Sequence, residues 1–198
     1  MSPRILEYAG REKYTIKIGG LVRELPLVQV SSDVWIASNA DLILGDIEFI
    51  QTAADLLCEK VKPFNPDIIV TPEAKAIAFA YEVAKKMRHK NMVIARKSVK
   101  AYMTDYLLEE CSSITTKGRQ ILLLVREDAL KLRGKKVCIL DDVVSTGGTI
   151  TALERLVRKA GGEVVCRAAI WIEGPWYTGD LIYLDELPIF VKKQNDQA

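Results

Sequence analysis

Residues 137–150 read Val-Cys-Ile-Leu-Asp-Asp-Val-Val-Ser-Thr-Gly-Gly-Thr-Ile, and this stretch decides the fold. Its first four residues have the apolar pattern of a strand that is buried on both faces. Two aspartates end the strand, a turn rich in glycine and hydroxyl groups follows, and helical apolar spacing begins at Ile150. The free N–H groups and the dipole of a helix's first turn attract anions, and glycine lets an anion approach the backbone closely. The stretch therefore predicts an anion-binding strand–turn–helix unit.

The two aspartates narrow the choice of ligand. Asp141 and Asp142 would repel a phosphate, so we expect them to face another part of the same ligand. Carboxylates accept hydrogen bonds from vicinal sugar hydroxyls or bind a hard cation through water. A ligand with a 5′-phosphate, a diol and a metal-bound pyrophosphate would satisfy both halves of the stretch.

On both sides of residues 137–150, strand and helix patterns alternate along most of the chain. We expect strands at 67–71, 91–96, 121–125, 136–141, 164–172, 181–184 and 189–191, and helices at 46–61, 74–88, 127–132 and 147–160. This alternation predicts an α/β fold, doubly wound, with a mostly parallel central sheet and helices on both faces. Ligands of such sheets bind at the carboxyl ends of the strands.

The first 40 residues have a different pattern, with short strands at 14–18, 25–30 and 34–38 between turns. We therefore expect a small, strand-rich N-terminal lobe at 1–40 beside a core at 41–198, the two forming a single functional domain. Residues 98–119 between the core elements are polar, and we expect them to be irregular.

Composition excludes several other classes of protein. The chain has 198 residues, 49% of them hydrophobic, which suits one globular domain. Its 28 basic and 26 acidic residues give a net charge of +2, which argues against a dedicated nucleic-acid binder. No apolar run approaches the ~20 residues of a membrane span, and the first residues lack a signal-peptide core. The four cysteines form no Cys-x-x-Cys pair, so we expect a cytoplasmic protein in which Cys58 and Cys138 pack as small hydrophobes.

The string Val137–Thr149 resembles the phosphoribosyl pyrophosphate motif of the type I phosphoribosyltransferases, purine branch. It has neither the lysine of a Walker loop nor a G-x-G-x-x-G pattern. The alternative is a solvated strand end with a glycine-rich N-cap, which thirteen consecutive matching positions disfavour.

The resemblance implies an enzyme of purine salvage. It would transfer ribose 5-phosphate from phosphoribosyl pyrophosphate to a purine base, with adenine as the first candidate, and release pyrophosphate with Mg²⁺. Asp141 and Asp142 would hold the ribose hydroxyls and are the candidate protein groups for the metal, which is otherwise bound through pyrophosphate. The 5′-phosphate would lie against Val143, Val144, Ser145, Thr146, Gly147, Gly148 and Thr149. Family members are commonly homodimers.

Two further segments resemble the pyrophosphate-binding parts of the family. Glu73, Ala74 and Lys75 follow the strand at 67–71 and resemble the pyrophosphate loop, although they also suit a plain helix N-terminus. Arg96, Lys97 and Lys100 follow the next strand and resemble the basic run of adenine and xanthine phosphoribosyltransferases. The alternative for this run is a solvated cationic strand end.

Residues 103–120 take the place of the family's mobile catalytic loop, in which Lys117 or Arg119 would meet the leaving pyrophosphate. Its part at 112–119 has no acid where the adenine enzymes carry a glutamate, and is closer to the xanthine enzymes and the purine repressor. Xanthine, guanine or hypoxanthine therefore remain open as the base. A non-catalytic regulator that senses phosphoribosyl pyrophosphate, like the effector domain of the purine repressor, also remains open.

The aromatic residues Trp171, Trp176 and Tyr177 follow a core strand and have two interpretations. They could stack on a base, or they could belong to the core or a dimer contact. We expect His89, at the end of a helix, to be exposed and to have no catalytic role.

Overall fold

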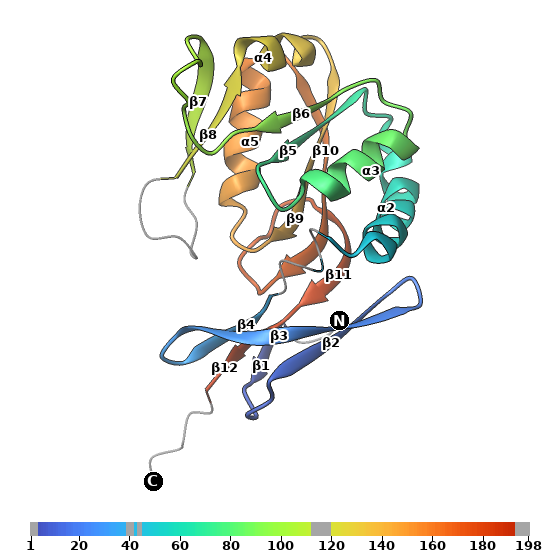
Figure 1. The fold of residues 1–198 in the computed structure, drawn as a ribbon, viewed down its shortest axis with the longest axis vertical. Helices are drawn as coiled ribbons and strands as arrows, with labels where there is room; N and C mark the ends of the chain where they lie inside the picture. Colours follow the sequence, from blue (N-terminus) through green and yellow to red (C-terminus); the bar gives the residue numbers. More distant parts are fainter. Residues whose placement is uncertain (1–3, 39–41, 43–44, 112–119, 193–198) are drawn as a thin grey trace.

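The computed structural model describes residues 4–38, 42, 45–111 and 120–192 (Figure 1). Its central sheet has the order β11-β10-β9-β5-β6, and every neighbouring pair is parallel. The strands are β5 (Ile68–Pro72), β6 (Met92–Ala95), β9 (Lys136–Val144), β10 (Glu163–Glu173) and β11 (Ile182–Leu187). The predicted parallel sheet is confirmed.

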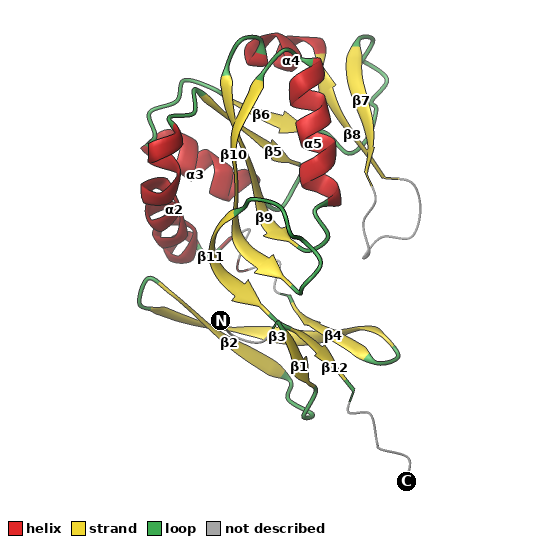
Figure 2. Cartoon of the chain, turned by 180° about the vertical axis from the view of Figure 1, so that it is seen from behind, coloured by secondary structure: helices red, strands yellow, loops and turns green. Residues whose placement is uncertain are grey.

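Helices cover both faces of this sheet (Figures 1 and 2). Successive side chains of a strand point to opposite faces, so Ile69 packs with α2 (Ile47–Val61) and α3 (Ile77–Lys86). Its neighbour Val70 packs with α5 (Gly148–Lys159) and with Leu132 of α4 (Arg126–Leu132). A short 3₁₀ helix, η1 (Lys62–Phe64), follows α2. Cys58 and Cys138 lie in the α2/α3 layer, as expected of small hydrophobes.

The order of the strands creates the crevice in which a ligand can bind. β5 and β9 are neighbours, yet the chain leaves β5 for α3 on one face and leaves β9 for α5 on the other. The two connections diverge, and a crevice opens at the carboxyl ends of these two strands. The 137–150 stretch therefore lies at the topological switch point of the sheet.

A second sheet forms the lobe below these carboxyl ends (Figure 1). Its order is β1-β12-β4-β3-β2, made of β1 (Ile5–Glu7), β2 (Lys13–Ile18), β3 (Leu21–Ser31), β4 (Val34–Ala37) and β12 (Ile189–Val191). The three strands predicted for the lobe are present, whereas β1 was not predicted. Because β12 lies between β1 and β4, the sheet of the lobe includes residues from beyond the expected boundary at residue 40.

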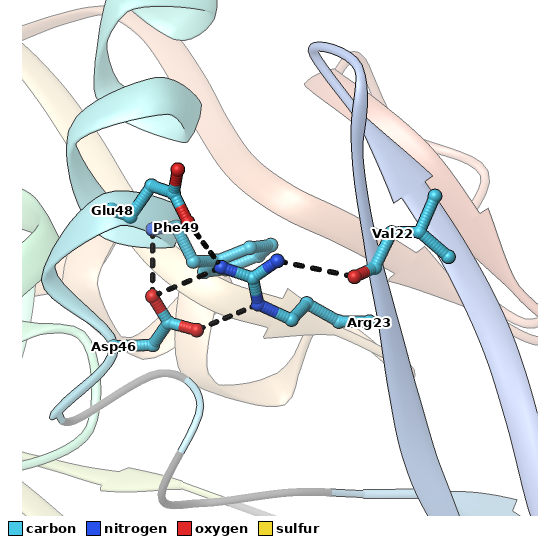
Figure 3. Close-up of polar contacts among 5 residues, drawn as sticks. All are labelled: Val22, Arg23, Asp46, Glu48 and Phe49. Atoms are coloured by element: carbon cyan, nitrogen blue, oxygen red, sulfur yellow. Dashed lines mark hydrogen bonds and ion pairs between the residues drawn. The ribbon is translucent and has the colours of Figure 1, made fainter.

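Arg23 of β3 joins the lobe to the start of α2 (Figure 3). Its Nε donates to Asp46 Oδ2 at 2.7 Å, and its Nη2 donates to Glu48 Oε2 at 2.7 Å. Asp46 is also the N-cap of α2, since its Oδ1 accepts from Phe49 N at 2.9 Å. The hydrogen bond from Arg23 lowers the pKa of Asp46. One carboxylate thus starts a core helix and holds a strand of the lobe.

The expectation of an irregular segment at 98–119 is wrong for 106–111. These residues form β7 (Tyr106–Cys111), which pairs antiparallel with β8 (Gln120–Val125). Arg96 and Leu123 exchange two backbone hydrogen bonds of 2.9 Å, which dock the hairpin beside β6. The alternation Leu-Leu-Glu-Glu in β7 is weak, so the sequence pattern did not reveal the strand.

Candidate functional site

A cavity of about 360 Å³ occupies the crevice at the carboxyl ends of β5 and β9. This volume is in the range of small-molecule sites. Its walls come from the ends of the five core strands or their loops, from the start of β8 and from the lobe. They are Leu25, Ile36, Ala37, Ser38, Pro72, Glu73, Lys75, Ala76, Lys97, Gln120, Asp141 through Ile150, Glu173 and Leu187.

The turn between β9 and α5 has the form of an anion cradle. Gly147 is the N-cap of α5 with φ +80°, a left-handed conformation that favours glycine. A Cβ at Gly147 would lie 2.2 Å from Cδ2 of Tyr177, so the Tyr177 ring packs directly against this turn. The first N–H groups of α5 lack partners within their own helix and lie at the cavity wall. The turn can therefore hold a phosphate.

Three carboxyl groups line the cavity near this turn. Asp141 is only 6% exposed, and burial, with Asp142 adding repulsion, raises its pKa well above the ordinary value. Its Oδ1 accepts from Asp142 N at 2.9 Å. Glu173, at the end of β10, is 8% exposed. Burial raises the pKa of Glu173, and a hydrogen bond with Ser145 opposes this rise.

The β5–α3 loop forms the opposite wall. Helix α3 begins at Ile77 rather than at the predicted residue 74, which leaves residues 73–76 as a loop whose Glu73–Ala74 peptide bond is cis. Glu73 Oε2 accepts from Lys97 N at 3.0 Å and from Arg96 Nε at 3.3 Å. These contacts, led by the Lys97 N–H, lower the pKa of Glu73. The carboxylate therefore ties the ends of β5 and β6 together.

The cavity has a charged half and an apolar half. The core supplies the charged groups, including Lys75 and Lys97 as well as the carboxylates. The lobe supplies the apolar residues Leu25, Ile36 and Ala37, and Leu187 of β11 adds to the same apolar wall. Leu25 is 2% and Leu187 1% exposed, so these side chains are packed firmly into a hydrophobic wall. Such a cavity suits a ligand with anionic groups at one end and a flat, apolar body at the other.

Most of the site residues predicted from the sequence meet at this cavity. The exceptions among the described residues are Ala74, Arg96 and Lys100, which do not line it. Arg96 turns to Glu73 and joins the β7–β8 hairpin through its backbone. The predicted catalytic residues Lys117 and Arg119 lie outside the described residues.

The sequence did not reveal several lining residues. Leu25, Ile36, Ala37 and Ser38 come from the lobe, and no local motif marks them as part of a site. Glu173 and Leu187 reach the cavity only because β10 ends beside β9 and β11 ends beside β10. An acidic residue directly after the apolar run 168–172, as Glu173 is, is the one signal in the sequence that could have found it.

Trp171, which lies within β10, and Trp176 and Tyr177, which follow it, do not line the cavity. Trp171 is 1% exposed and stacks on Phe49 with ring centroids 5.5 Å apart, so it belongs to the core. His89 is half-buried rather than exposed, because its Nε2 lies 2.9 Å from the Pro66 carbonyl oxygen. Burial lowers the pKa of His89.

The charges of the cavity favour a ligand that brings a cation. Four carboxyl groups and two ammonium groups line it, so an added pyrophosphate would increase an existing excess of negative charge. Within the described ranges no three His, Cys, Asp or Glu side chains gather into a metal cage. Mg²⁺ commonly binds through substrate phosphates and water with few protein carboxylates, and this donor set fits that mode.

Among the described residues, no helix has the length and apolar character that a membrane span needs.

Comparisons with known proteins identify relatives of the chain. The family model of the phosphoribosyl transferase domain matches residues 44–185. The adenine phosphoribosyltransferase of Thermosipho africanus is 37% identical over 123 residues, which cover 62% of this chain and 69% of that protein. The adenine phosphoribosyltransferase of Thermotoga petrophila is 39% identical over 127 residues, 64% of this chain and 71% of that protein. The crystal structure of adenine phosphoribosyltransferase from Thermoanaerobacter pseudethanolicus has a TM-score of 0.61 at 26% identity, covering 71% of this chain and 82% of that one.

Proposed function

The chain belongs to the phosphoribosyl transferase family, and from this premise we propose that it transfers ribose 5-phosphate from phosphoribosyl pyrophosphate to adenine. The observation that carries the proposal is the single cavity that joins the β9–α5 cradle to an apolar wall of the lobe. Relatives over 35% identical are adenine phosphoribosyltransferases, which supports adenine over the oxopurines as the base.

Each part of the donor has a matching part of the cavity. The 5′-phosphate fits the turn from Ser145 to Thr149, where backbone N–H groups and the dipole of α5 meet an anion. Asp141 and Asp142 can accept hydrogen bonds from the ribose hydroxyls. The pyrophosphate fits beside Lys75 and Lys97, at the ends of β5 and β6. The base then lies against the apolar wall of the lobe.

The reaction breaks the bond between the sugar C1′ and the pyrophosphate oxygen and forms a bond from C1′ to a base nitrogen, which gives up its proton. Positive charge develops on the sugar while the pyrophosphate departs, so catalysis depends on position and charge. In this proposal Asp141 and Asp142 stabilise the sugar, and Lys75 and Lys97 stabilise the leaving group; all four side chains line the cavity. Mg²⁺, bound through the pyrophosphate, would neutralise its charge. The proposal includes a homodimer located in the cytoplasm.

A panel of bases tests the proposal. Phosphoribosyl pyrophosphate and Mg²⁺ are incubated with adenine, hypoxanthine, guanine, xanthine or orotate, and nucleotide formation is followed by chromatography. We expect adenosine monophosphate to form fastest. Binding of phosphoribosyl pyrophosphate without turnover of any base would instead favour a sensing role.

A further inference from the structure

We propose that Glu173 selects the base, by accepting a hydrogen bond from an exocyclic 6-amino group and rejecting bases that present a carbonyl oxygen there. The inference rests on the proposed function, because it concerns the base that shares the cavity with phosphoribosyl pyrophosphate.

The position of Glu173 in the sheet places it between the two halves of the cavity. Its Cα pairs in register with Leu187 on β11, and Gly174 N donates to the Leu187 carbonyl oxygen at 3.1 Å. Leu187 belongs to the apolar wall with Leu25 and Ala37. On the other side, Ser145 of the phosphate turn lowers the pKa of Glu173, and both residues line the cavity. A base joined to the sugar must lie at this boundary.

Few other described residues of the apolar half can discriminate between polar edges of a base. Leu25, Ile36, Ala37 and Leu187 have no polar side-chain atoms. The hydroxyl of Ser38 and the amide of Gln120 can each donate or accept, so they suit either kind of edge. An ionised carboxylate can only accept. Among the lining groups there, Glu173 is therefore the one that can bind an N–H edge of the base but not a carbonyl edge.

The burial of Glu173 makes a missing hydrogen-bond partner costly. The side chain is 8% exposed, so water can do little to replace a missing partner. Ser145 and Lys75 favour the ionised, accepting form, while burial and Asp142 oppose it. A 6-aminopurine offers N–H donors at its exocyclic amine. A 6-oxopurine offers a carbonyl oxygen, which would face the carboxylate without a hydrogen bond.

The decisive variant is Glu173→Gln, which keeps the size and one acceptor of the side chain and adds an N–H₂ donor. The matched control is Glu163→Gln, the same change at the exposed, opposite end of β10. The specificity constant kcat/KM is measured with adenine and with hypoxanthine at pH 8.5, because a higher pH favours the ionised, accepting carboxylate. Circular dichroism and a thermal melt establish that each variant is folded.

We expect the adenine-to-hypoxanthine ratio of kcat/KM to fall at least about tenfold in Glu173→Gln and to stay unchanged in Glu163→Gln. The fall should include a gain in rate with hypoxanthine, which loss of a purely structural residue would not produce. Glu173→Leu should lose adenine activity without that gain, and it serves as the second variant.

An unchanged ratio in folded, active Glu173→Gln would overturn the inference, as would a wild-type protein that prefers hypoxanthine to adenine. In both cases the protein is still a phosphoribosyltransferase, and the proposed function survives in its general form. A wild-type protein that uses none of the bases would overturn the proposed function and the inference with it.

Discussion

Asp141 shows how a residue suited to a site can weaken the fold that carries it. Burial and the neighbouring Asp142 raise its pKa. A carboxyl group whose pKa rises on folding binds protons more tightly in the folded state, so stability falls as the pH rises above the unfolded pKa of about 3.9. Asp141→Asn keeps the acceptor for Asp142 N and removes the charge. We expect a higher free energy of unfolding at pH 7.5, by more than the ~0.5 kcal/mol typical of surface changes.

Urea denaturation at several pH values measures this effect. The gain from Asp141→Asn should shrink towards zero as the pH falls through about 4, because the wild-type carboxyl is then protonated in both states. Equal stability of the two proteins at pH 7.5 would contradict the assignment of a buried, repelled carboxyl.

Gly147 combines two constraints that a pair of variants can separate. Its φ of +80° strains any other residue, and an added Cβ would meet the Tyr177 ring. Gly134 has a similar φ of +68° with open space around it, so Gly134→Ala measures the backbone strain alone. We expect Gly147→Ala to lower affinity for phosphoribosyl pyrophosphate at least tenfold in calorimetry, and Gly134→Ala to leave it unchanged.

Tyr177→Ala should restore part of the affinity lost by Gly147→Ala, since it removes the ring that the new Cβ would displace. If Gly147→Ala binds as the wild type does while remaining folded, the turn is not the phosphate cradle.

At the scale of elements, Asp46 couples α2 to β3. Asp46→Asn keeps the cap on Phe49 N but weakens the ion pair with Arg23, whereas Asp46→Ala removes both. We expect Asp46→Ala to cost about 1–2 kcal/mol of unfolding free energy and Asp46→Asn less. Because Arg23 lies two residues from Leu25 in the cavity wall, both variants should raise KM for the base more than KM for phosphoribosyl pyrophosphate. Equal effects on the two KM values would mean that the lobe does not hold the base.

The elements that the sequence predicted well are those whose signal is local. The run 137–140 marks β9, and the glycines after it mark the start of α5. β1 has three residues and β7 alternates weakly, so neither has a pattern that stands out from its surroundings. The start of α3 at Ile77 depends on Glu73 binding the end of β6, which is a contact across the sheet. The lobe's part of the site could not be predicted for the same reason, since only the assembled sheets bring Ile36 and Asp142 to the same cavity.

At the scale of the whole molecule, binding of the donor should stabilise the folded protein. A ligand at 100 times its Kd contributes about 2.7 kcal/mol. For a chain of this length that corresponds to a rise in Tm of about 5–11 °C. We expect phosphoribosyl pyrophosphate with Mg²⁺ to produce such a rise in a thermal melt.

The double variant Asp141→Asn with Asp142→Asn should show a much smaller rise and near-complete loss of turnover, since each lost hydrogen bond to a charged group costs roughly 1.5–3 kcal/mol. A full thermal shift and normal turnover in the double variant would sink the site assignment.

The pairing of β12 with β1 and β4 also has a consequence for how the chain matures on the ribosome. Trp35 and Phe190 are neighbours in the lobe sheet but 155 positions apart in the order of synthesis. At roughly 5–20 residues per second, about 8–30 s separate their translation. During that interval the strands of the parallel sheet emerge in order, while the edge of β4 that later pairs with β12 has no partner strand. The wall proposed to hold the base is therefore completed last, after the turn proposed to hold the phosphate.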